Sequence, residues 1–90
     1  MKTVITYIEN IELEIPLHAV YEICHSGDNS EAVTAHLDDS IKEQLNRYTQ
    51  KQLMQAVAAY GIENAETMTI KELQQYILWL GAWDIFDGLA

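Results

Sequence analysis

Residues 3–15 have the sequence TVITYIENIELEI, and this stretch decides how the N-terminal part of the chain folds. Two alternating runs flank the dipeptide Glu9-Asn10, and Asn10 can adopt the positive φ that a two-residue turn needs. The stretch therefore predicts a β-hairpin. In the resulting register, one face carries the six side chains that we expect to be buried: Val4, Thr6, Ile8, Ile11, Leu13 and Ile15.

The opposite face of this hairpin pairs Tyr7 with Glu12 and Ile5 with Glu14. A slip of one residue would bury both glutamates, so the sequence specifies the register strongly. Two strands alone are only marginally stable in water. Helices from the rest of the chain must therefore cover the apolar face.

The rest of the chain carries apolar residues at helical spacing, separated by residues that start or end helices. Pro16 can occupy the first position of a helix, and Gly27 ends that helix. Ser30 can cap the next segment, which continues to Tyr48 as one helix or two. Gly61 ends a later helix.

Three pairs of residues have the spacing of a capping box, in which two side chains each accept a hydrogen bond from the other residue's backbone N–H. The pairs are Ser40 with Glu43, Thr49 with Gln52 and Thr69 with Glu72. The first pair predicts a break near residue 39, and the others start two further helices, the last over residues 70–87. We therefore expect a single α+β domain over residues 1–90. A hairpin over 3–15 packs on four to five short helices within 16–87, and the last helix is central.

The composition restricts the classes of function. The chain has 90 residues, 14 Asp and Glu against 5 Lys and Arg, a formal net charge of −9, and 49% hydrophobic residues. These values describe one small globular domain that is too apolar for an acidic disordered tail. The charge argues against direct binding of DNA or RNA, whose phosphates need Lys and Arg, and against an anionic membrane surface.

The negative charge is concentrated in the first half of the chain. Residues 1–45 hold nine acids and two bases, which gives −7, whereas residues 46–90 hold five acids and three bases, which gives −2. Spaced carboxylates can imitate the phosphates of a nucleic acid and bind the basic channel of a nucleic-acid-binding protein. The candidate partner-binding residues are Glu12, Glu14, Asp38, Asp39 and Glu43, with Tyr7 as an aromatic anchor. A solvated surface that only keeps the chain soluble stays open as the alternative.

The sequence has none of the common catalytic motifs, so we expect neither an enzyme nor a cofactor. Cys24 and His25 are adjacent, but neighbours on a helix point about 100° apart and do not form a catalytic dyad. His18, Cys24, His25 and Asp28 are residue types that bind zinc. However, His18 and His25 lie about 10 Å apart along a helix, and no second pair of ligands follows at zinc-site spacing. We therefore expect no metal, and a small metal-binding protein using His18, Cys24 and His25 is kept as an alternative.

The last predicted helix is apolar almost all round from Tyr76 to Phe86. This pattern is typical of a central core helix, or of a helix that presents one face to a partner. As an alternative function, a homodimeric structural or regulatory module would associate through the aromatic stripe of Tyr76, Trp79, Trp83 and Phe86. The apolar run is too short to span a bilayer, and the N-terminus lacks the apolar region of a signal peptide, so we expect a cytoplasmic protein.

Parts of the chain match a pattern found in a known class of proteins. Residues 59–61 (AYG), 72–73 (EL) and 77–85 (ILWLGAWDI) resemble the "YG…EL…LWIAA.DI" ending of small phage- and prophage-encoded proteins. Residues 24–28 (CHSGD) resemble their "SH-x-GD" loop, although Asn29 stands where a cysteine is expected. This class of small acidic accessory proteins includes inhibitors of host defence such as anti-CRISPR proteins. The resemblance implies an inhibitor that binds a host defence complex, of CRISPR type or another nucleic-acid-binding kind, in the host cytoplasm.

Overall fold

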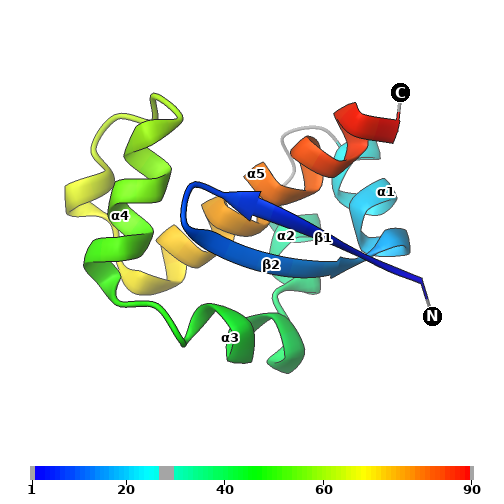
Figure 1. Cartoon of the computed structure of the whole chain (residues 1–90), viewed down its shortest axis with the longest axis horizontal. Helices are drawn as coiled ribbons and strands as arrows, with labels where there is room; N and C mark the ends of the chain where they lie inside the picture. The colour runs from blue at the N-terminus through cyan, green and yellow to red at the C-terminus, as the bar shows by residue number, and fades with distance from the viewer. Residues whose placement is uncertain (1, 27–29, 90) are drawn as a thin grey trace.

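The computed structural model describes residues 2–26 and 30–89, and Figure 1 shows how its elements are arranged. It confirms the predicted α+β fold, in which an N-terminal antiparallel hairpin packs against five α-helices. The elements in chain order are β1 (Thr3–Ile8), β2 (Ile11–Pro16), α1 (Leu17–His25), α2 (Ser30–His36), α3 (Asp39–Leu45), α4 (Gln50–Ala59), the 3-10 helix η1 (Ala65–Thr67) and α5 (Ile70–Leu89).

The hairpin has the predicted register. Its cross-strand pairs are Val4 with Ile15, Ile5 with Glu14, Thr6 with Leu13, Tyr7 with Glu12 and Ile8 with Ile11. The prediction that Asn10 takes the positive φ is wrong, because Glu9 has φ 53° and Asn10 does not have a positive φ. A positive φ at the first central residue alone is the pattern of a type II′ turn. The strained backbone is therefore at Glu9, and not at Asn10, which adopts positive φ more easily.

Helix α5 is the central helix, as predicted, and it packs against α1, α2, α4 and both strands. Figure 1 shows α5 crossing behind the hairpin. Gly81 allows the close approach: a Cβ at this position would lie 3.1 Å from Ile15 Cδ1 and 3.2 Å from Thr6 Cγ2. Both distances are shorter than ordinary van der Waals contact, so the hairpin rests directly on the α5 backbone at this point.

The helix starts follow local capping chemistry, with one correction to the sequence prediction. The capping boxes at Thr49 and Thr69 are confirmed. The break between α2 and α3 also falls where it was expected, but Ser40 does not cap α3. Asp38 is the N-cap, and its side chain accepts a hydrogen bond from the Ile41 N–H at 3.1 Å. Asp38 has the extended backbone of an N-cap residue, whereas Ser40 already lies inside the first turn.

The other helix ends differ only in detail from the sequence prediction. Pro16, the predicted first helical residue, ends β2 and is the N-cap of α1, so the helix begins one position later, at Leu17. Gly61 follows α4 with φ 81°, which confirms it as a stop. Gly27 lies outside the described residues, and η1 was not predicted. None of the helices in the described ranges is long and apolar enough to cross a membrane.

Candidate partner-binding surface

The outward face of the hairpin carries four of the side chains that the sequence places there. Ile5 is 51% exposed and Tyr7 is 61% exposed, and Glu12 and Glu14 are exposed beside them. Thr3 Oγ1 donates a hydrogen bond of 2.7 Å to Glu14 Oε1. Two apolar side chains on β1 and two carboxylates on β2 therefore lie side by side and in contact with solvent.

Helix α3 is fixed against the outer edge of β2 by side chains that replace a neighbouring strand. Gln44 Oε1 accepts a hydrogen bond from the Glu14 N–H at 2.7 Å, and Gln44 Nε2 donates to the Glu14 carbonyl at 3.0 Å. The Tyr48 hydroxyl accepts from the Glu12 N–H at 3.0 Å. We call this the closed edge. It was not predicted, because residues 30 and 36 positions apart meet here and nothing local marks the pairing.

Four predicted partner-binding acids lie on two neighbouring elements, and we call this set the acidic face: Glu12 and Glu14 on β2, and Asp39 and Glu43 on α3. All four are exposed, and the packing of α3 against β2 brings the two pairs to neighbouring elements. Asp38 is also exposed, but its carboxylate caps α3, which gives it a structural role. Within residues 2–26 and 30–89, no Lys or Arg forms an ion pair with these four carboxylates.

A pocket of about 240 Å³ opens next to the acidic face, at the turn of the hairpin. It lies between the turn residue Glu9, Tyr48 and two glutamines of α4, Gln52 and Gln55. Its walls offer a carboxylate, amide oxygens and an aromatic ring, and no Lys or Arg lines it. These groups suit a cationic side chain. Sequence reasoning missed this pocket, because its walls come from three separate segments.

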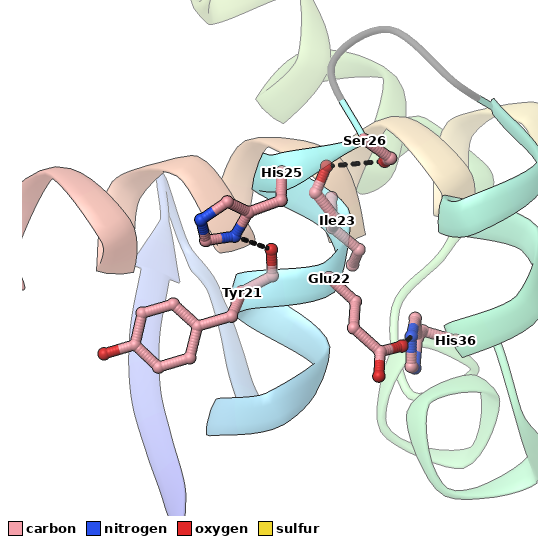
Figure 2. Close-up of polar contacts among 6 residues, drawn as sticks. All are labelled: Tyr21, Glu22, Ile23, His25, Ser26 and His36. Atoms are coloured by element: carbon pink, nitrogen blue, oxygen red, sulfur yellow. Dashed lines mark hydrogen bonds and ion pairs between the residues drawn. The ribbon is translucent and has the colours of Figure 1, made fainter.

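The histidine and cysteine side chains of α1 point to separate neighbours. His25 Nδ1 lies 2.6 Å from the Tyr21 carbonyl oxygen, the contact drawn as a dashed line in Figure 2. Because a carbonyl oxygen only accepts, this nitrogen carries the proton of the bond. Cys24 is buried, and burial together with the Asp87 carboxylate raises the pKa of its thiol. His18 instead packs near the ring of His36, with ring centroids 5.8 Å apart.

The candidate metal ligands are therefore not brought together. Within residues 2–26 and 30–89, no three His, Cys, Asp or Glu side chains form a group that could hold a metal ion. Asp28, the fourth residue of the candidate set, lies outside the described residues. Glu22 and His36 instead link α1 to α2, with Oε2 and Nε2 2.5 Å apart (Figure 2).

The aromatic stripe of α5 takes part in core packing. Trp79, Trp83 and Phe86 are partly buried and pack against the core. Their rings meet edge to face, with centroids 6.4 Å apart for Trp79 and Trp83 and 5.7 Å apart for Trp83 and Phe86. Tyr76 is the one exposed member of the stripe. Most of the surface that the homodimer alternative would use is therefore shared with the core.

The acidic face offers carboxylates and a neighbouring aromatic ring, which are groups for recognition by charge and shape. It can attract a cationic surface from a distance, since exposed charges without an ion pair add to the long-range field. Comparison of the chain with protein-family models, curated proteins and solved structures gives no match.

Proposed function

We propose that this chain is a phage-derived, non-enzymatic inhibitor that binds a host defence complex and competes with nucleic acid for a basic surface. The acidic face and Tyr7 make the contact, and the chain itself does not bind nucleic acid. The proposal combines the charge of the chain with its resemblance to phage accessory proteins.

One observation carries the proposal: the carboxylates of the acidic face are exposed and have no cationic partner among the described residues. A surface that only keeps the chain soluble can also be acidic, but its carboxylates need no fixed positions relative to one another. Here Gln44 holds α3 to the backbone of β2, so the position of Glu43 is coupled to that of Glu14. Rigid placement before binding reduces the entropy lost on association.

The proposed mechanism is electrostatic capture followed by exclusion. A net charge of −9 accelerates the encounter with a basic channel, and the attraction weakens as salt screens it. Once bound, the acidic face occupies the Lys and Arg side chains that would otherwise contact phosphates. To block the nucleic acid, the inhibitor needs to occupy only some of the Lys and Arg side chains of the channel.

The experiment is affinity capture from nuclease-treated host lysate, with the full chain as bait and double-stranded DNA or RNA as competitor. We expect recovery of a nucleic-acid-binding defence complex that competitor and salt both displace. The double variant Glu12→Lys with Glu14→Lys should lose the complex. If the bait recovers no nucleic-acid-binding protein, the proposal fails.

A matched control separates local contact from total charge. The double variant Glu63→Lys with Glu66→Lys makes the same change in net charge, from −9 to −5, at exposed residues between α4 and α5. We expect this control to keep most of the binding. Equal loss in both double variants would show that only bulk charge matters and would contradict a defined acidic face.

A further inference from the structure

The two outer edges of the hairpin are unequal. In an antiparallel pair, alternate residues point their N–H and C=O groups away from the partner strand. On β2 these residues are Glu12 and Glu14, and both meet side chains at the closed edge. Their cross-strand partners on β1 are Tyr7 and Ile5, whose N–H and C=O groups point away on the other side of the hairpin.

We call the outer side of β1 the open edge. In the described chain, no group forms a hydrogen bond with the outward N–H or C=O of Ile5 or Tyr7. Both side chains are more than half exposed. The strand Thr3–Ile8 contains no charged residue and no proline, so it lacks the usual protections of a free edge. The open edge is a template for another strand.

Acidic groups lie beside the open edge near the turn. Asp84 on α5 accepts a hydrogen bond of 2.5 Å from Thr6 Oγ1, which places its exposed carboxylate next to β1. Glu9 follows β1 directly. Burial raises the pKa of Tyr60, and the Asp84 and Glu9 carboxylates raise it further. This end of the open edge is negative and has no cationic partner among the described residues.

We propose that β1 takes an extended segment of the partner protein as a third strand, with a Lys or Arg of that segment facing Asp84 and Glu9. The inference rests on the proposed function, since it names how the basic partner engages the hairpin. Ile5 and Tyr7 together offer two donors and two acceptors, which suits a short strand added to a sheet edge. The acidic face, on β2 and α3, then begins one strand farther away.

Charge decides between a partner strand and a second copy of this chain. A second copy would bring another net charge of −9 to an edge that is already negative. Its own β1 would supply no charged group, because the strand is uncharged over Thr3–Ile8. A basic segment gains attraction where a second copy meets repulsion.

The test uses synthetic peptides selected from a random displayed dodecapeptide library against the full chain. We expect the selected peptides to be enriched in Lys and Arg and to slow amide hydrogen exchange at Ile5 and Tyr7. Ile5→Pro removes an outward donor and should weaken peptide binding about tenfold. Ile5→Thr keeps the N–H and is the matched control, which should bind nearly as well as the original chain.

Several outcomes would overturn the inference. The inference is wrong if the library yields no binder, if the selected peptides are acidic, or if they slow hydrogen exchange only at amides outside β1. It is also wrong if the chain forms a dimer in sedimentation and the dimer slows hydrogen exchange at the β1 amides. If Ile5→Pro does not fold, the exchange measurement on the original chain still decides. Capture from lysate separates the two proposals. Loss with Glu12→Lys and Glu14→Lys but not with Ile5→Pro defeats the third strand alone, and the reverse pattern defeats competition through the acidic face.

Discussion

The closed edge and the open edge belong to one hairpin, yet the fold treats them differently. At the closed edge, Gln44 and Tyr48 bond to the outward backbone groups of Glu14 and Glu12. At the open edge, the equivalent groups of Ile5 and Tyr7 face solvent. Figure 1 shows α3 next to β2, while the rest of the hairpin lies against α5.

This difference teaches how a small fold divides structure from recognition. A two-stranded hairpin needs packing partners, and here α5 covers one face while α3 covers one edge. The outward backbone groups of the remaining edge have no partner in the described chain, and this is where we propose that a partner strand binds. Breaking the closed edge should therefore cost stability, and changing the open edge should cost binding.

The largest effect should come from lifting the whole hairpin off α5. In Gly81→Leu, the new side chain meets Ile15 and Thr6 and pushes the hairpin away from its support. We expect the free energy of unfolding to fall by about 3 kcal/mol, at the upper end of the usual cost of overpacking. Gly88→Leu is the control, since nothing lies within 4 Å of a Cβ there. Chemical denaturation measures both, and equal changes would contradict the close contact at Gly81.

Proline substitutions compare the two edges directly, because Ile5 and Glu14 face each other across the hairpin. Glu14→Pro removes the backbone N–H that donates a hydrogen bond to Gln44 Oε1. Ile5→Pro removes an N–H that has no hydrogen-bond partner in the described structure. We expect Glu14→Pro to destabilise the fold by about 1 to 2 kcal/mol more than Ile5→Pro does. Thermal unfolding of the two variants gives the difference. Equal loss would show that the edges are equivalent.

Opening the closed edge should have a smaller effect on stability. Gln44→Ala removes both hydrogen bonds to Glu14, and we expect a loss of about 1 kcal/mol, because water can reach the freed groups. Tyr48 still accepts the hydrogen bond from the Glu12 N–H in this variant, so the closed edge is opened at Glu14 only. Gln50→Ala, whose side chain makes one long bond of 3.4 Å to Met68, is the control and should leave the free energy of unfolding nearly unchanged. Equal losses in the two variants, measured by chemical denaturation, would contradict a role of Gln44 at the closed edge.

The closed edge also marks the limit of what the sequence could predict. The register followed from a period of two over residues 3–15, where a slip would bury carboxylates. The capping boxes at Thr49 and Thr69 followed from local chemistry. The role of Gln44 did not, since a glutamine one residue before a helix end has no local signature for binding a strand 30 residues earlier.

The same limit applies to the candidate site. Exposure of Glu12 and Glu14 was predictable, because the alternation of the strand dictates it. The role of Asp38 as a cap was missed, since Ser40 also fits the spacing of a capping box, and only the backbone conformation decides between them. The turn was placed correctly but its strained residue was not, because two neighbouring residues compete for one position of positive φ.

That strained residue gives the next prediction. Glu9→Gly should stabilise the fold by about 0.5 kcal/mol, because relief of the left-handed conformation exceeds the added flexibility of the unfolded chain. Asn10→Gly relieves no positive φ and only adds flexibility to the unfolded chain, so it should destabilise the fold by a similar amount. The pair of denaturation curves tests whether Glu9 alone bears the strain. Stabilisation by Asn10→Gly would place the positive φ there instead.

The smallest effect concerns Tyr60, which reports on the charge beside the open edge. Its pKa is raised above 10.0 by burial, by Asp84 and by Glu9, so the folded chain holds the phenol proton more tightly than the unfolded chain does. The resulting stability is present below the unfolded value and is lost as pH rises through the folded pKa. As the pH rises from about 9 to about 11, the free energy of unfolding should therefore fall less for Tyr60→Phe than for the original chain. Chemical denaturation at each pH measures this difference.

The same tyrosine can distinguish a bound basic strand from an empty edge. A Lys or Arg placed near Asp84 and Glu9 offsets the two charges that raise the pKa of Tyr60. Binding of a selected peptide should therefore lower that pKa, seen as an earlier rise in tyrosinate absorbance that is missing in Tyr60→Phe. A peptide whose Lys and Arg are replaced by Gln should leave the titration unchanged. If the basic peptide binds without moving it, its cations lie elsewhere, and the open edge is not where charge is matched.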